Sequence, residues 1–188
     1  MLEIDTQEGP FRVYARGTIT RALQAGQWWD SHLRAILDEH QGGVAVDIGA
    51  HFGWFTRYLA TTHPRVYACE PWAPSFALLQ ENVLRPLVDR WHGDVQCWPV
   101  AAYDRVAALG FAAANDRTDE GNFAFFPTTP LDPLEYVPAA PLDNYLPADA
   151  HITVVKCDAQ GADLQALQGM AHAIRRCRPS SGSSMLYR

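Results

Sequence analysis

The sequence predicts a doubly wound α/β domain, in which a parallel β-sheet is flanked by helices. Between residues 44 and 176, short apolar runs bounded by glycine, proline or acidic residues alternate with segments of helical periodicity. Near-continuous apolar strands are typical of a parallel sheet that is covered on both faces. A turn with glycines at both ends, Gly49 to Gly53, directly follows the first of these strands, as in folds of this class.

The first 42 residues are expected to form short strands and one helix that pack on the core. Apolar residues among polar neighbours suggest the strands within the first 20 positions. Apolar residues then recur at helical spacing from Asp30 to His40, and Asp30 or Ser31 is the expected N-cap.

Residues 43–179 are expected to form the main domain, with four strands and the helices between them. The strands are predicted at residues 44–48, 65–69, 95–101 and 151–157. The helices are predicted at residues 52–60, 74–84 and 162–176. Pro74 suits the first turn of its helix, because a proline there gives up no hydrogen bond.

Residues 103–147 have a different character, with phenylalanines punctuated by Asp, Asn and Pro. We expect an antiparallel hairpin and a loop, inserted over the carboxyl edge of the sheet, where ligands bind in such folds. Residues 180–188 show no strand pattern and are expected to be an irregular tail.

Composition indicates a soluble protein with one sizeable core. The 188 residues carry 21 acidic and 15 basic side chains, a formal net charge of −6, without a block rich in lysine and arginine. A nucleic-acid partner is not expected, since phosphates are held mainly by basic groups. No apolar stretch approaches the roughly 20 residues that span a bilayer, and the N-terminus does not resemble a signal peptide.

The cysteines and histidines indicate neither a disulfide framework nor a metal site. Cys69, Cys97, Cys157 and Cys177 are scattered without C-x-x-C spacing, and three of them lie in or beside apolar runs. Buried reduced thiols explain this pattern better than disulfides or zinc. The histidines lack the spacing of metal ligands. We therefore expect a cytoplasmic protein without a bound metal.

The motif DIGAHFG, Asp47 to Gly53, is the strongest functional signal. Gly49 allows a sharp turn and a close approach of the backbone to a ligand, and Gly53 allows the next helix to begin tight against the sheet. Asp47 places a carboxylate where it can meet a ligand cation or a polarised N–H group. A dinucleotide is the weaker alternative, because its fingerprint is G-x-G-x-x-G and a carboxylate repels a pyrophosphate. A purely structural turn is the other alternative.

Glu70 is the second piece of this site, 21 residues after Gly49 and at the end of the next strand. A carboxylate there can accept two hydrogen bonds from the hydroxyls of a ribose. Such charge-assisted bonds contribute roughly 1.5–3 kcal/mol each.

Four motifs in this order resemble those of the FkbM-type methyltransferases. They are DIGAHFGWFT (47–56), ACEP (68–71), ENV (81–83) and KCDAQGADLQALQGM (156–170). The segments QWWD (27–30) and PLDNYL (141–146) fit the same pattern, so the resemblance covers roughly residues 15–179. The first motif alone marks only the methyltransferase superfamily, whereas the last, in order with the others, makes the family specific.

The resemblance implies a Rossmann-like class I methyltransferase fold and methyl transfer from S-adenosyl-L-methionine to a hydroxyl oxygen. It also implies the cofactor contacts. The methionine end would be lined by Asp47, Gly49, Ala50 and Gly53. The ribose would be held by Glu70, in a motif that ends with Pro71. The adenine would be bordered by Ala101, Ala102 and Asp104.

Asp158 and Lys156, at the end of the fourth strand, are the catalytic candidates. A hydroxyl acceptor must lose its proton, and Asp158 is the first choice for the general base. Lys156 could orient an acceptor oxygen. The alternatives are that Asp158 only caps the next helix and that Lys156 is a solvated or ion-paired side chain.

Three further positions are weaker candidates. The ring of His51, within the glycine turn, could touch the cofactor or the acceptor. Asn122 could contact the acceptor, although a role in a turn is favoured. Trp28 and Trp29 are expected to anchor the following helix to the core, with a lid over the cofactor as the alternative.

The sequence departs from the family pattern in two places. Gln160 stands where the family often has Glu, and no further strands are expected after Pro179. We therefore expect missing C-terminal strands, a sheet order of 3-2-1-4, and an exposed fourth strand through which a homo-oligomer could form. The expected activity is O-methylation of a small molecule or glycan, and the alternative is a catalytically inactive cofactor-binding fragment.

Overall fold

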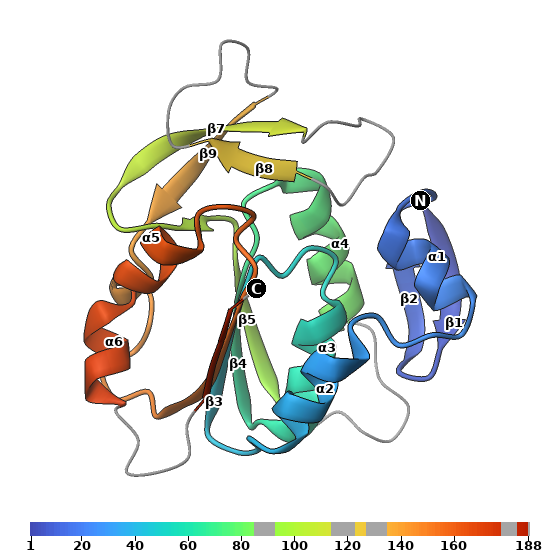
Figure 1. The fold of residues 1–188 in the computed structure, drawn as a ribbon, viewed down its shortest axis with the longest axis horizontal. Coiled ribbons are helices and arrows are strands. Elements are labelled where there is room, and N and C mark those ends of the chain that lie inside the picture. The colour runs from blue at the N-terminus through green and yellow to red at the C-terminus, as the bar shows by residue number, and fades with distance from the viewer. Residues whose placement is uncertain (85–92, 114–122, 127–134, 178–183, 188) are drawn as a thin grey trace.

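The computed structural model of the chain describes residues 1–84, 93–113, 123–126, 135–177 and 184–187. Its centre is a parallel sheet with the strand order β11-β10-β3-β4-β5 (Figure 1). The strands are β3 (Val44–Ile48), β4 (Arg65–Cys69), β5 (Asp94–Trp98), β10 (Ile152–Cys157) and β11 (Ser184–Tyr187). The predicted α/β class is confirmed, and so is the order of the four predicted strands.

Helices cover both faces of this sheet (Figure 1). One face carries α2 (Ser31–Asp38), α3 (Trp54–Thr62) and α4 (Ala73–Leu84). The other carries α5 (Asp163–Gln168) and α6 (Ala171–Arg176). Successive strand residues point to opposite faces, so Ala45 packs in the cluster on the α3 side and Val46 in the cluster on the α5 side.

The expectations of an irregular tail and of a four-stranded sheet were wrong. Residues Ser184–Tyr187 form β11, which pairs in parallel with β10, and Lys156 lies opposite Leu186. Strand pairing uses backbone N–H and C=O groups, and the edge of β10 offers a row of them to a segment that lacks a side-chain pattern. β10 is therefore an internal strand of the sheet.

The helix predicted at residues 162–176 is divided into α5 and α6 around Gly169. A Cβ atom on Gly169 would lie 1.9 Å from the Tyr103 carbonyl oxygen, so only glycine fits this close approach. The Gly169 carbonyl accepts the N–H of Asp143, and the Asp143 carboxylate accepts the N–H groups of His172 and Ala173. These contacts end one helix and cap the next.

The N-terminal segment forms β1 (Leu2–Thr6) and β2 (Gly9–Val13), an antiparallel hairpin, followed by α1 (Thr18–Gln24). The strands were expected, but α1 was not. The fully buried Arg57 of α3 donates hydrogen bonds to the carbonyls of Glu8 and Pro10. Asn82 of α4 exchanges hydrogen bonds with the Arg12 backbone. The hairpin is thereby fastened to both helices.

The insert forms a second sheet, with the order β6-β9-β7-β8, at the carboxyl end of the main sheet (Figure 1). Its strands are β6 (Ala101–Ala102), β7 (Ala107–Ala113), β8 (Phe123–Phe126) and β9 (Glu135–Ala140), with η1 (Leu142–Asn144) after them. β7 pairs antiparallel with β8 and β9, which confirms the predicted hairpin. The strand predicted at residues 95–101 is shorter, because the chain leaves the main sheet near Pro99, which lacks a backbone donor.

Candidate active site

A cleft of about 670 Å³, partly open to solvent, lies where β3, β4 and β10 end and β6 begins. Seven residues predicted for the site line it: Gly49, His51, Glu70, Pro71, Ala101, Ala102 and Asp158. The carboxyl ends of parallel strands meet at one edge of the sheet, which is why residues from distant segments converge there.

The glycine turn at the end of β3 is packed tightly against β10. Gly49 has a φ of 70°, and a Cβ atom on it would lie 2.0 Å from the Asp158 carbonyl oxygen. The N–H groups of Gly49 and Ala50 both donate to the Cys69 carbonyl, and the Gly53 N–H donates to the Ala50 carbonyl. These donors are committed within the protein, so they do not form a cradle for a phosphate.

Glu70 is held in a fixed orientation at the end of β4. One carboxylate oxygen accepts the His51 N–H and the other accepts the Trp72 N–H, each at 2.9 Å. Burial raises the pKa of Glu70 to about 7, and the two N–H donors and the charge of Lys156 only partly oppose this rise. Each oxygen still has acceptor capacity for a ligand hydroxyl.

Asp47 and Lys156 contact each other rather than line the cleft. Lys156 Nζ lies 2.9 Å from Asp47 Oδ1, and Asp47 Oδ2 accepts the Thr56 hydroxyl at 2.6 Å. Burial lowers the pKa of the Lys156 amine, but the carboxylates of Asp47 and Asp158 raise it by more, so the net shift is upward. Lys156 is therefore a buried ion-paired ammonium, as one of the two interpretations of its sequence position expected.

Asp158 lies half-buried in the cleft lining, with its Oδ1 accepting a hydrogen bond from the Gln160 side chain at 3.2 Å. It does not cap α5, whose N-cap position is Ala162 and carries no side-chain cap. Asp163 instead accepts the N–H groups of Ala159 and Gly161. The alternative role of Asp158 as a helix cap was thus wrong.

Three other predicted positions lie away from the lining. Ala50 is buried in a small apolar cluster with Leu79, and Gly53 faces Leu79 so closely that a Cβ atom would lie 2.8 Å from its Cδ1. Asp104 pairs with Arg105 at 2.9 Å. Asn122 lies outside the described residues.

The sequence did not point to the aromatic wall of the cleft. Tyr14 stacks on Trp72 with ring centroids 5.7 Å apart, lies 5.4 Å from the His51 ring, and shares a 2.9 Å hydrogen bond with Ser75. His51, Trp72 and Ser75 line the cleft, and Ile19 of α1 joins them. These contacts join positions 37 to 61 residues apart in sequence, and no sequence pattern links such distant segments.

Trp28 anchors its segment to the core, as expected. Its ring packs on Trp54, Phe55 and Tyr58, with centroid distances of 5.0–5.5 Å. Trp28 does not belong to the cleft lining.

The cysteines are all free, although two are only half-buried. Cys69 lines the cleft, but burial raises its pKa to about 12, so it is a neutral thiol. Within the described residues no group of three or more His, Cys, Asp or Glu is placed to hold a metal ion.

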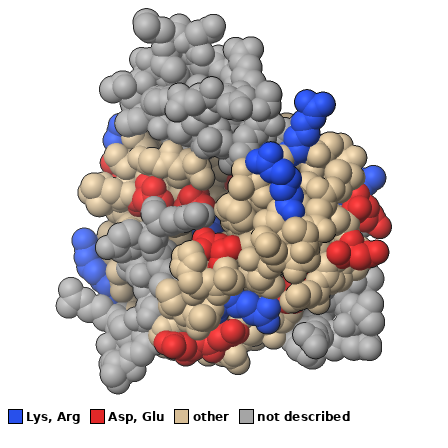
Figure 2. Space-filling view, turned by 45° about the vertical axis from the view of Figure 1, so that its right-hand side comes forward, with Lys and Arg blue, Asp and Glu red and all other residues tan. Residues whose placement is uncertain are grey.

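The cleft lining is largely apolar, and its carboxyl groups are acidic. Glu70 and Asp158 line it, and among its lining residues in the described chain none is Lys or Arg. On the described part of the face in Figure 2, side chains of both signs are interspersed and neither forms a continuous patch. The described helices include none with the length and apolarity to cross a bilayer.

Comparison with known proteins identifies a family whose model matches this chain. The model of the FkbM methyltransferase domain matches residues 47–181. A solved FkbM methyltransferase from Methylobacillus flagellatus KT is 22% identical with a TM-score of 0.49, over 73% of this chain and 31% of that one. A precorrin 8w decarboxylase from Methanobacterium thermoautotrophicum is 20% identical with a TM-score of 0.41, over 80% of this chain and 59% of that one. The chain thus spans less than two thirds of either structure. No curated protein matches it.

Proposed function

Because the chain belongs to the FkbM methyltransferase family, we propose that it transfers a methyl group from S-adenosyl-L-methionine to a hydroxyl oxygen. A small molecule or a glycan is the proposed acceptor. The proposed location of the protein is the cytoplasm, in keeping with its four free cysteines.

The orientation of Glu70 is the observation that carries this proposal. A carboxylate fixed by two backbone N–H groups at the end of the second strand can accept the two hydroxyls of a ribose without first reorganising. Ala101 and Ala102 form an apolar border nearby in the same cleft, which suits the face of a nucleobase. Glu70 and these alanines are therefore the proposed nucleoside contacts.

The charge of the cleft supports a cationic sulfonium nucleoside over a dinucleotide. Lining acids attract a sulfonium and an ammonium but repel a pyrophosphate. The turn N–H groups that would bind phosphate are already bonded to Cys69 and Ala50.

In the proposed reaction, bound S-adenosyl-L-methionine would supply an electrophilic methyl group. The cleft walls would hold the acceptor oxygen in line with that methyl group, so that alignment would provide much of the rate. Asp158 would accept the proton that the acceptor hydroxyl loses as its oxygen bonds to the methyl carbon. The bond from that carbon to the sulfonium sulfur would break, and S-adenosylhomocysteine would leave. The Gln160 amide fixes one oxygen of Asp158 and leaves the other for this transfer.

The alternative of an inactive cofactor-binding fragment rested on a sheet that ends at its fourth strand. β11 occupies the position beside β10, which supports an active enzyme over such a fragment. Activity is accordingly the proposal that we retain.

Isothermal titration with S-adenosylhomocysteine, the demethylated product, tests the cofactor assignment. We expect micromolar affinity in the unaltered chain and a loss of about 10- to 100-fold in Glu70→Ala, which is the magnitude of one to two charge-assisted hydrogen bonds. Glu81→Ala is the matched control, because Glu81 is exposed and pairs only with Arg12 among the described residues.

Two results would contradict the proposal. One is the absence of binding at millimolar S-adenosylhomocysteine. The other is tight binding of NADH, which its fluorescence would report. Equal affinity of Glu70→Ala and Glu81→Ala would overturn the assignment of Glu70 while leaving the family untouched.

A further inference from the structure

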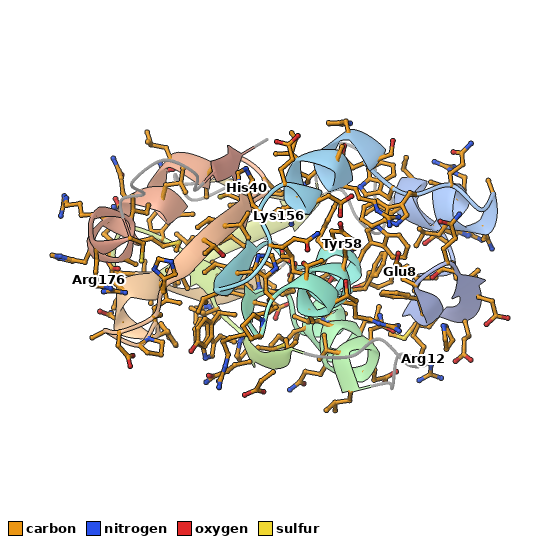
Figure 3. All side chains as sticks on the ribbon, turned by 90° about the horizontal axis from the view of Figure 1, so that it is seen from below. Glu8, Arg12, His40, Tyr58, Lys156 and Arg176 are labelled. Atoms are coloured by element: carbon orange, nitrogen blue, oxygen red, sulfur yellow. The ribbon has the colours of Figure 1, made fainter. Side chains whose placement is uncertain are left out.

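Lys156 is the only lysine among the 188 residues, and the other 14 basic side chains are arginines. It is 5% exposed and lies in the interior, on the α3 side of the sheet (Figure 3). In the register of β10 and β3 it stands directly opposite Asp47. The sole lysine thus lies outside the cleft lining, on a strand that ends at the cleft.

The ammonium group has three donors and three acceptors around it. Nζ lies 2.9 Å from Asp47 Oδ1, 2.9 Å from the Gly49 carbonyl oxygen and 3.3 Å from the Ile48 carbonyl oxygen. A compact ammonium suits three convergent oxygens, whereas the planar guanidinium of arginine does not. Nζ donates hydrogen bonds to the two carbonyls and forms an ion pair with Asp47, so its partners lie within the protein.

The Gly49 carbonyl connects this ion pair to the cleft. Lys156 holds the turn by that carbonyl from one side, and the Cys69 carbonyl holds the Gly49 and Ala50 N–H groups from the other. The next residue of the turn, His51, donates its N–H to Glu70. A displacement of the turn therefore displaces a donor that orients Glu70.

We infer that Lys156 is a positioning residue for the nucleoside cofactor, acting through Asp47 and the Gly49 turn, and that it contacts neither the cofactor nor the acceptor. This inference rests on the proposed function. It differs from a direct catalytic role, in which Lys156 would affect turnover and leave cofactor affinity unchanged.

The electrostatic surroundings give this role a measurable signature. Lys156 is the cation that offsets the carboxylates of Asp47, Asp158 and Glu70 at this end of the sheet. Its charge lowers the pKa of Glu70, and the charge of Asp47 raises it. Removal of Lys156 alone should raise the pKa of Glu70 further. When Lys156 and Asp47 are both removed, their opposite effects on this pKa should largely cancel.

The test is a double-mutant cycle on Asp47→Asn and Lys156→Met, with S-adenosylhomocysteine affinity measured by calorimetry from pH 5.5 to 8.5. We expect Lys156→Met to weaken binding by about 10-fold or more and to move the pH midpoint of binding upward. The double variant should bind more tightly than Lys156→Met, because it leaves no unpaired buried carboxylate.

The cycle needs two controls. Arg65 and Asp94 form a 3.0 Å ion pair across β4 and β5, so Arg65→Met and Asp94→Asn remove a cross-strand pair outside the cleft lining. These variants should bind as the unaltered chain does. The His51 imidazole, which also lines the cleft, is removed in a His51→Asn background, since Asn tolerates the φ of 52° there.

A second measurement uses the unaltered chain, so it does not depend on whether Lys156→Met folds. Labelling with ¹⁵N-lysine gives a single side-chain signal, because the chain has one lysine. We expect that signal to be a slowly exchanging ammonium that shows no nuclear Overhauser contact with bound S-adenosylhomocysteine.

The outcomes separate the two proposals. Unchanged affinity in Lys156→Met, or a direct contact between Nζ and the ligand, overturns the positioning role. Failure of the unaltered chain to bind S-adenosylhomocysteine overturns the proposed function itself.

Discussion

The carboxylate of Glu70 accepts the backbone N–H of His51 at 2.9 Å, so the acid at the end of β4 is oriented by the turn that follows β3. This single contact joins the two strongest sequence motifs in space. A change in either motif is therefore expected to reach the other, and four predictions examine this site and its supports.

Glu70→Gln should make stability less dependent on pH. The pKa of Glu70 is raised to about 7 from 4.5 in the unfolded chain, so the folded state binds more protons between these values. Its carboxylate therefore costs stability as pH rises from about 4.5 to 7, by about 3 kcal/mol in total. Urea unfolding at pH 5 and pH 8 should show this loss in the unaltered chain and a smaller one in Glu70→Gln. Identical pH slopes in both would contradict the burial argument.

Gly49→Ala should be far more damaging than Gly26→Ala. Both glycines have a φ near 70°, so both substitutions carry a backbone strain of about 1–2 kcal/mol. Only at Gly49 would the new Cβ atom also meet backbone, 2.0 Å from the Asp158 carbonyl oxygen. Thermal unfolding of the two variants isolates that clash, and equal melting temperatures would refute it.

Tyr14→Phe should cost about 1 kcal/mol, because it leaves the buried Ser75 hydroxyl without its Tyr14 partner. In the Tyr14→Phe background, Ser75→Ala should lower the free energy of unfolding much less than it does in the unaltered chain, because the hydrogen bond is already lost. Tyr14→Ala should in addition weaken S-adenosylhomocysteine binding, as it removes the ring stacked on Trp72. Calorimetry and urea unfolding measure the two effects, and strict additivity would argue against the hydrogen bond.

Asp158→Asn should slow methyl transfer by about 10²- to 10⁴-fold, the usual contribution of a general base, and should weaken cofactor binding by much less. A single-turnover assay with a labelled methyl group, run with a hydroxyl acceptor, measures this loss. Asp163→Asn is the contrasting variant, because Asp163 supports the loop backbone and its loss should lower stability. Full activity in Asp158→Asn would exclude it as the base.

The main sheet was predictable because local signals mark its strands. Gly42-Gly43, Gly49 and Pro71 bound β3 and β4, and the bounds of both strands were predicted correctly. The break between α5 and α6 was not predicted, because it depends on the approach of the Tyr103 carbonyl from a distant segment. β11 was not predicted for a different reason. It pairs with β10 through backbone N–H and C=O groups, which leave no pattern in the side chains.

For the site, the sequence placed Glu70 and Asp158 at the edge where the structure has them. It did not predict that Asp47 would face Lys156 instead of the cleft. The direction of a strand side chain follows from the register of its neighbour, and one sequence does not contain that register. Ile19 lines the cleft and Tyr14 packs on its lining residues, and both belong to a segment that precedes every recognised motif.

The short strand β6 lies beside β9, with Ala101 opposite Ala139, so the insert leaves and rejoins the body of the protein at nearly the same point. A segment with adjacent ends can be exchanged for a shorter or longer one without displacing the strands below it. Because Ala101 and Ala102 border the cleft, such an exchange would begin beside it and leave the strand ends with Glu70 and Asp158 in place. The insert can therefore differ in length without a change in the parallel sheet that carries the site.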